Sequence, residues 1–415
     1  MNVAMISLCA LLVVILLSCV TRLNVGFVAI AFAWGISLVA GIDANQVMAG
    51  FPSSLFLTLV GVTLLFTQAE VNGTLERVAE ALMRLAGGNA GGVVVLFFLM
   101  AAVLSTIGAG AIATAALVAP LAMGAAGRAG ISPFLMAIIV GNGSNAGNLS
   151  PLSPVGVVAQ KTLERIGLAE HAWRIYSNHL IAHVLITAIV LAVLGGWKIW
   201  RLRAKQREGQ ATSQRWEWMH WLTLGVIAML LVGVIFLKVP VGLGAFAAAM
   251  VLTVCRAAPE SAVIAKMPWG IILMVSGMSL LIAMLERTGG LDLFSAAIAR
   301  FSTPHSITAV VALVSGIVSA YSSTSGVVLP AFLPMVPKLI AQMGGGDAVG
   351  IISSINLGSH LVDVSPLSTI GAMCIAAAGA GVDRQKLFRD LMLWGMSMAL
   401  VGALASYVLF GGWLL

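Results

Sequence analysis

The chain has 415 residues, of which 60% are hydrophobic and only 9% are charged, and its mean hydropathy is +1.05. A soluble globular domain does not combine so few charges with so many apolar side chains. About 250 apolar residues, at roughly 20 for each helical crossing, allow at most about twelve spans, and loops reduce this to about ten. The composition therefore predicts an all-α integral membrane protein and excludes soluble enzymes, nucleic-acid-binding proteins and disordered tails.

The net charge of +7 comes from basic residues that are dispersed over the predicted loops instead of forming one docking surface. This distribution is typical of residues that set membrane topology, and we expect no nucleic-acid partner. The four cysteines lie singly in apolar segments without CxxC spacing, so neither a disulfide nor a metal site is predicted; they are Cys9, Cys19, Cys255 and Cys374.

The first half of the chain begins with apolar runs at residues 3–20, 25–41 and 53–70, followed by an amphipathic surface helix near 72–87. The first run has no basic residue before it and Arg22 after it, so we expect a retained span with its N-terminus outside.

The next apolar run, 91–127, is interrupted by "STIGAGA" at 105–111, which predicts a re-entrant hairpin with a glycine-rich tip. A span near 133–160 is broken by "GNGSNAGNLSP", and the last span of this half lies near 179–200.

The second half repeats the first. A shift of 216 positions pairs Pro52 with Pro268 and Gly61 with Gly277, and a shift of 215 places "NLSPLSPVG" at 148–156 over "DVSPLSTIG" at 363–371. We therefore divide the chain into a first repeat, a basic linker and a second repeat, which cover residues 1–196, 197–220 and 221–415. Broken helices and a second re-entrant hairpin are expected in the second repeat as well.

The two repeats are expected to have inverted topology, because five crossings and one hairpin leave the second half starting on the opposite side of the membrane. With the linker in the cytoplasm, 15 Lys and Arg lie inside and seven outside. The expected location is the bacterial inner membrane, with both termini in the periplasm.

The duplicated breaks are the predicted site, since an interrupted membrane helix is tolerated only where its free backbone groups contact protein, water or a ligand. Half-helix N-termini suit carboxylates, and unwound carbonyls suit a small cation. The expected substrate-binding residues are Ser105, Thr106, Asn145, Asn148, Ser322, Ser323, Thr324, Ser359 and His360. The expected ion-coupling residues are Asn142, Ser144, Ser150, Asn356, Asp363 and Ser365. Close helix packing is the alternative explanation for any one of these small polar residues.

Asp363 is the one carboxylate expected at membrane depth, which is an energetically costly position for it. His360 lies one helical turn earlier, so the two residues are candidates for binding a coupling cation or relaying a proton. A neutral structural pair, or a position nearer the membrane edge, explains them equally well. The other five histidines are expected near interfaces without a metal-binding role; they are His171, His179, His183, His220 and His305.

The segment "SSTSGVVLPAFLPM" at 322–335 and the two "SPLS" breaks resemble the ion transporter superfamily. The resemblance is to divalent anion:sodium symporters and MatC-type malonate or dicarboxylate carriers. It implies a hairpin motif at Ser322, Ser323 and Thr324, with Gly108, Ala109 and Gly110 as its counterpart. It also implies a scaffold and a moving transport domain, an elevator-like movement and a homodimer.

The expected function is that of a symporter that imports malonate or a C4-dicarboxylate with sodium ions or protons. It is not expected to be an enzyme, and no cofactor is expected beyond a possible coupling Na⁺. The predicted site contains no Lys or Arg, so helix dipoles, co-bound cations and a protonated His360 would balance a dianion.

Two alternatives stay open. The first is a Na⁺/H⁺ or metalloid antiporter of the same superfamily, with Asp363 as its principal ion-binding residue. The second is the permease subunit of a tripartite system that needs a solute-binding partner. "GNGSNAG" lacks a βαβ context and no Walker motif is present, so neither dinucleotide binding nor ATP hydrolysis is expected.

Overall fold

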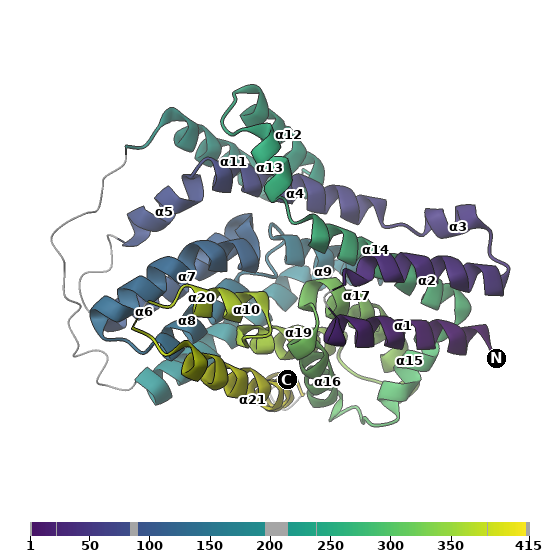
Figure 1. Cartoon of the computed structure of the whole chain (residues 1–415). Helices are drawn as coiled ribbons and strands as arrows, with labels where there is room; N and C mark the ends of the chain where they lie inside the picture. The colour runs from purple at the N-terminus through teal and green to yellow at the C-terminus, as the bar shows by residue number, and fades with distance from the viewer. Residues whose placement is uncertain are drawn as a thin grey trace.

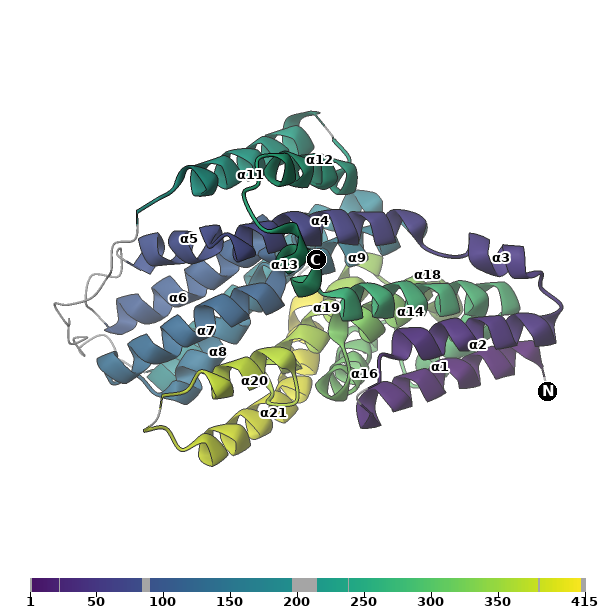
Figure 2. The same ribbon diagram turned by 45° about the horizontal axis from the view of Figure 1, so that its top comes forward.

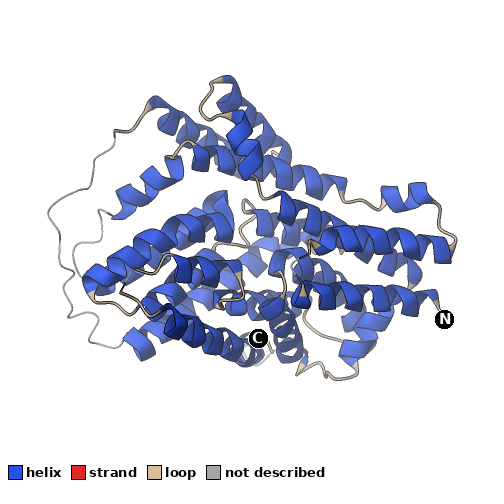
Figure 3. Cartoon of the chain, in the orientation of Figure 1, coloured by secondary structure: helices blue, strands red, loops and turns tan. Residues whose placement is uncertain are grey.

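The computed structural model describes residues 2–21, 23–83, 90–195, 215–237, 239–379 and 381–411. Over these residues the chain is helical and contains no strand (Figure 3). Part of the predicted surface helix and most of the predicted linker, residues 84–87 and 197–214, lie outside this description. The last predicted linker residues, 218–220, form the first turn of a helix instead.

The first half contains ten α-helices and three short π or 3-10 segments within the described residues. They are α1 Val3–Val20, α2 Val25–Ala40, α3 Ala44–Ala49, α4 Ser53–Val71, α5 Thr74–Met83, α6 Ala90–Leu104, η2 Ser105–Ala109, α7 Gly110–Ala129, α8 Pro133–Ala146, α9 Pro154–Arg165, η3 Ala169–His171, α10 Ala172–Val190 and η4 Leu191–Gly195. The predicted hairpin and the predicted broken span are both present, at η2 and between α8 and α9.

The described part of the second half runs through the same order of elements. They are α11 Trp218–Leu237, α12 Val241–Val254, α13 Glu260–Lys266, α14 Trp269–Thr288, α15 Gly290–Ala299, α16 Ile307–Tyr321, η5 Thr324–Val328, α17 Leu329–Phe332, η6 Leu333–Met335, α18 Val336–Met343, α19 Ala348–Leu361, η7 Val362–Val364, α20 Thr369–Ala376 and α21 Arg384–Phe410. The second interruption lies at residues 322–328, and the second break lies between α19 and α20.

The predicted class, an all-α membrane protein with broken helices, is confirmed. In the described residues, six helical stretches are long and apolar enough to cross a bilayer: 53–71, 90–127, 169–194, 269–288, 324–343 and 384–410. Six shorter apolar helices accompany them. Large apolar side chains such as Phe27, Trp34 and Leu404 are exposed, as expected of surfaces that face lipid. The predicted number of about ten spans is not tested by these lengths.

Two helix pairs pack reciprocally between the halves: α4 contacts α12, and α14 contacts α2 (Figures 1 and 2). A Cβ atom added to Gly61 would lie 2.5 Å from the carbonyl oxygen of Gly242. One added to Gly277 would lie 2.2 Å from the carbonyl oxygen of Gly26. Glycine is needed at these crossings because the backbones touch. The two contacts are related by the shift of 216 found in the sequence, which supports the proposed division into two repeats.

Buried apolar side chains form two large clusters. The first joins α1, α2, α4, α12, α14 and α15. The second joins α6, α7, α8, α10, α20 and α21, and Figure 1 shows α6, α7 and α8 side by side. Elements from both clusters contribute to the cavity that contains the candidate site.

Candidate functional site

The tip between α6 and α7 is built on glycines. Gly108 has φ +124° and Gly110 has φ +73°, a backbone region that side chains with a Cβ rarely adopt. A Cβ atom on Gly108 would also lie 2.1 Å from the ring of Phe66 on α4. The chain therefore turns at this point, and the backbone of the tip lies directly against α4.

The first break, between α8 and α9, is held by Ser153 and Asn148. The Ser153 hydroxyl accepts a hydrogen bond from the Gly156 amide at 3.0 Å, which caps α9. It also lies within hydrogen-bonding distance of the Asn148 and Ser150 carbonyl oxygens. The Asn148 side chain crosses to the tip, where its Oδ1 accepts from the Ala111 amide at 3.0 Å. The break and the tip of the first half are thus joined.

The second break, between α19 and α20, repeats this arrangement of hydrogen bonds 215 residues later. Ser368 caps α20 by accepting from the Gly371 amide at 3.3 Å and donates to the carbonyl oxygens of Ser365 and Asp363. Asp363 takes the position of Asn148 and reaches the other interruption. Its carboxylate accepts from the Thr324 hydroxyl at 2.9 and 3.0 Å. Among the described residues it has no ion-pair partner.

Both interruptions and both breaks line one cavity of about 660 Å³. Helical segments begin at four positions in its wall, namely Gly110 of α7, Pro154 of α9, Thr324 of η5 and Thr369 of α20. The N-terminal end of a helix carries a partial positive charge and free amide groups, so the longer of these starts favour an anion in the cavity. Thr63 and Thr67 of α4 add hydroxyl groups to the wall.

The prediction that the site contains no basic residue is wrong. Lys266, the last residue of α13, lines the cavity and is the one Lys or Arg in its wall among the described residues. Its Nζ lies 3.0 Å from an oxygen of Glu70, which also lines the cavity from α4. The sequence did not indicate Lys266 or Glu70 as site residues, because neither position shows which helix packs beside it.

Five of the nine predicted substrate-binding residues line the cavity: Asn145, Asn148, Ser322, Ser323 and Thr324. Within the described structure, the Ser322 hydroxyl and the Asn145 Oδ1 are buried without a hydrogen-bond partner, so the protein itself does not satisfy either group. Ser323 instead uses its hydroxyl to accept from the Gly326 amide at 3.0 Å.

Four predicted substrate-binding residues do not line the cavity, which corrects their expected placement. Thr106 contacts the Tyr176 hydroxyl at 3.0 Å, and Ser359 donates to the Ile355 carbonyl oxygen at 2.7 Å. Ser105 and His360 are fully buried elsewhere. These residues lie on faces of their helices that pack against other helices.

Of the predicted ion-coupling residues, Asp363 lines the cavity and the other five are buried away from its wall: Asn142, Ser144, Ser150, Asn356 and Ser365. Within the described residues, both side-chain atoms of Asn356 and the hydroxyls of Ser144 and Ser365 have no hydrogen-bond partner. Their ion-coupling role stays a prediction.

His179 and His183 lie in the interior of the protein. Both are fully buried on α10, and the ring of His179 contacts those of His183 and His360, with centroid distances of 4.5 and 4.8 Å. The sequence contains a signal for this pair, since positions 179 and 183 lie on one face of a helix. The described residues contain no group with metal-binding geometry.

The comparisons with known proteins agree with this geometry. Residues 1–148 match the model described as dicarboxylate carrier protein MatC N-terminus, whereas no curated protein matches the chain. The solved YdaH transporter of Alcanivorax borkumensis is 17% identical, with a TM-score of 0.57 over 90% of both chains. MtrF of Neisseria gonorrhoeae, from a class of antimetabolite efflux pumps, is 14% identical, with a TM-score of 0.55 over 91% of this chain and 84% of its own. The predicted resemblance to MatC-type carriers is thereby confirmed over residues 1–148, and the chain as a whole has a membrane-transporter fold.

Proposed function

We propose that this protein is a secondary active transporter that imports a small dicarboxylate, such as malonate or a C4-dicarboxylate, with a cation gradient. The observation that carries the proposal is the convergence of helix N-termini and Lys266 on one cavity. A dianion needs positive charge where it binds, and both sources are present in the same wall. The match of the N-terminal third of the chain to dicarboxylate carriers supports the same substrate class.

The ion pair between Lys266 and Glu70 can be exchanged for an ion pair between Lys266 and a substrate carboxylate. In the structure the Lys266 ammonium group is paired with the Glu70 carboxylate at 3.0 Å. A substrate carboxylate offers the same chemistry, so an incoming dicarboxylate replaces Glu70 at Lys266. Because the pair is partly exposed, it contributes only about 0–1 kcal/mol to folding, and its substitution leaves the protein folded.

Transport by the purified chain in proteoliposomes is the direct test. Labelled malonate or succinate is expected to accumulate under an imposed sodium or proton gradient, and acetate is not. Ion exchange that is indifferent to dicarboxylate would favour the antiporter, and uptake that requires an added binding protein would favour the permease subunit. Loading the label inside the vesicles tests the direction, which the fold shared with an efflux pump does not decide.

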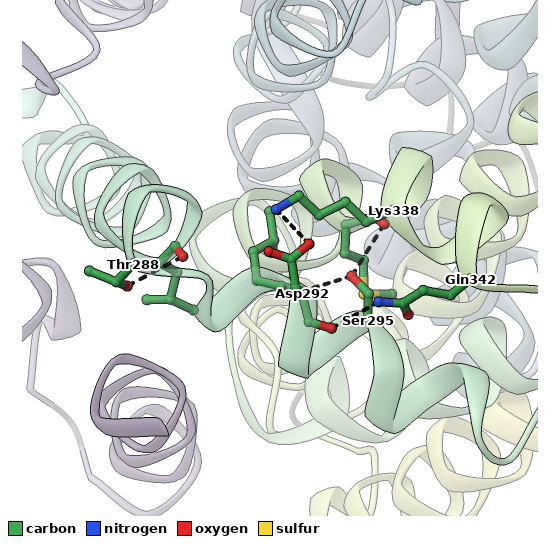
Figure 4. Close-up of polar contacts among 8 residues, drawn as sticks. Thr288, Asp292, Ser295, Lys338 and Gln342 are labelled. Carbon is green, nitrogen blue, oxygen red and sulfur yellow. Dashed lines mark hydrogen bonds and ion pairs between the residues drawn. The ribbon is translucent and has the colours of Figure 1, made fainter. Parts of the chain in front are cut away.

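Lys266→Gln is expected to raise the malonate concentration for half-maximal uptake by roughly tenfold, equivalent to about 1.4 kcal/mol. The matched control is Lys338→Gln. Figure 4 shows Lys338 of α18 reaching Asp292 of α15, and this pair, with a 2.8 Å contact, does not line the cavity. Equal effects of the two substitutions would remove Lys266 from the substrate site.

A further inference from the structure

The buried histidines His179, His183 and His360 form a cluster that substrate binding alone does not explain. They come from α10 and α19, each is fully buried, and none lines the cavity. His179 is the central ring and contacts both of the others. Three touching imidazoles in a protein interior are costly unless their nitrogens have partners, so the cluster requires a functional or structural reason.

The hydrogen bonds of the cluster fix two of its tautomers. His179 Nε2 lies 2.9 Å from the Asn145 carbonyl oxygen, and His360 Nδ1 lies 2.8 Å from the Asn356 carbonyl oxygen. A carbonyl oxygen only accepts, so these two nitrogens carry the hydrogens and the opposite nitrogen of each neutral ring is a bare acceptor.

The remaining four nitrogens of the cluster have no hydrogen-bond partner among the described residues. His179 Nδ1, His360 Nε2 and both nitrogens of His183 are buried without a hydrogen-bond partner in the described structure. A buried acceptor without a donor costs about 1–3 kcal/mol. With all three rings neutral, His183 has one N–H group and one lone pair, so the four nitrogens comprise one donor and three acceptors. One added proton would make the numbers of donors and acceptors equal.

Groups on the surrounding elements do not donate a hydrogen bond to these four nitrogens in the described structure. The hydroxyl of Tyr176 contacts Thr106, and the carboxylate of Asp363 accepts from Thr324 and Ser319. The other titratable groups on the described helices nearby are Tyr321 on α16, Cys374 on α20 and Tyr407 on α21, and none of them is hydrogen-bonded to these four ring nitrogens. The charged side chains of α9, η3, α10, α18 and α21 are exposed or half-buried. In the described residues no carboxylate forms an ion pair with a ring of the cluster, so an additional anion in the cavity would favour a proton there.

Asn145 connects the cluster to the cavity. It lines the cavity, its carbonyl oxygen accepts from His179, and its side-chain amide donates to the His360 carbonyl oxygen at 3.0 Å. A dianion in the cavity is thus separated from the rings by one residue. We propose, on the basis of the function proposed above, that the three-histidine cluster binds a proton together with the dicarboxylate, so that the two ligands bind cooperatively through Asn145. Each then raises the affinity for the other by the same factor.

Proton uptake on substrate binding tests this linkage. The purified full-length chain is mixed with malonate, adjusted to the same pH, in a weakly buffered solution that contains a pH indicator. Calorimetry of the unsubstituted protein in two buffers with different ionisation enthalpies gives the proton number independently of any variant. About one proton is expected for each malonate bound. Malonate binding without proton uptake overturns the inference and leaves the proposed function intact, whereas absence of malonate binding overturns both.

The variant His183→Gln tests whether the proton binds to the cluster, because neither nitrogen of His183 has a partner in the described structure. This variant is expected to bind malonate without taking up a proton. The matched control is His220→Gln, since His220 is also buried but accepts from the Glu217 amide at 3.0 Å and contacts the Asn72 carbonyl oxygen at 3.1 Å. Uptake is expected to persist in the control. Uptake that also persists in His183→Gln would overturn the inference.

Discussion

The two breaks have the same arrangement of hydrogen bonds but differ in the side chain at its centre. Ser153 and Ser368 cap the following helices in the same way, and both accept from an amide three residues later. The central side chain is the neutral Asn148 in the first half and the carboxylate Asp363 in the second. Asn148 bonds to a backbone amide, whereas Asp363 bonds to hydroxyl groups and has no cationic partner in the described residues. The serine caps are therefore a requirement of the fold in both halves. Only the second break has a carboxylate at this position, that of Asp363, without a cationic partner in the described residues.

The interruptions that face the two breaks differ in a related way. The tip between α6 and α7 has no polar side chain from Gly108 to Gly110, and its backbone packs on Phe66. The interruption after α16 presents Ser322, Ser323 and Thr324 to the cavity. The first half offers mainly backbone groups and the second half offers side chains, so substitutions in the second half are expected to affect transport more directly.

Asp363→Asn is the strongest test of this asymmetry. Hydrogen bonds to a charged group contribute about 1.5–3 kcal/mol, so coupled uptake is expected to fall by roughly 10- to 100-fold while the protein stays folded. Uptake in proteoliposomes and thermal unfolding in detergent measure the two properties. Asp292→Asn, at an exposed carboxylate of the α15–α18 pair, is the control. Full coupled activity of Asp363→Asn would remove this residue from the ion site.

Gly108→Ala tests the backbone character of the first tip. Its Cβ would lie 2.1 Å from the Phe66 ring at a φ of +124°, and overpacking of this kind costs about 1–3 kcal/mol. We expect a lower unfolding temperature and reduced transport. Gly127→Ala on the adjoining helix α7, where a Cβ meets nothing within 4 Å, is the matched control. Equal stability of the two variants would contradict the close packing of the tip on α4.

Asn148→Ala removes the bond between the first break and the first tip. Loss of a side chain that caps a helix costs about 0.5–2 kcal/mol, so the unfolding temperature is expected to fall slightly and uptake to fall several-fold. Asn148→Asp keeps the acceptor and is expected to preserve stability, although it adds a negative charge beside the substrate. If Asn148→Asp supports uptake as well as the unsubstituted protein does, transport does not require a neutral side chain at the first break.

Ser323→Ala is expected to have the smallest effect. The hydroxyl bonds to the Gly326 amide, and a neutral hydrogen bond contributes about 0.5–1.5 kcal/mol. The malonate concentration for half-maximal uptake should therefore rise by roughly 2- to 10-fold. The same measurement on Ser302→Ala, outside the cavity, gives the background. An unchanged value for Ser323→Ala would make it a packing residue.

Much of the site follows from the sequence because breaks in membrane helices leave local signals. Glycine and polar residues predicted interruptions at 105–111 and within 141–151, and the structure has them at η2 and from Gly147 onwards, because α8 stays helical through Ala146. The interruption at 322–328 agrees with the hairpin motif that the family resemblance implied at Ser322, Ser323 and Thr324. Asp363 stood out because a carboxylate in an apolar segment is costly. The position of Lys266 left no such signal, because α13 is placed at the cavity by its packing against α4, which lies far away in the sequence.

The sequence by itself determined the class of protein, the order of elements in the two halves and the positions of the interruptions. These properties depend on hydropathy and on backbone groups close together in the chain. The tertiary structure alone decided which face of each helix meets the cavity: His360 packs against α10 while Asp363, three residues later, reaches the cavity. Helical periodicity relates residues on one helix to one another, but the direction that each face takes depends on the helices packed around it.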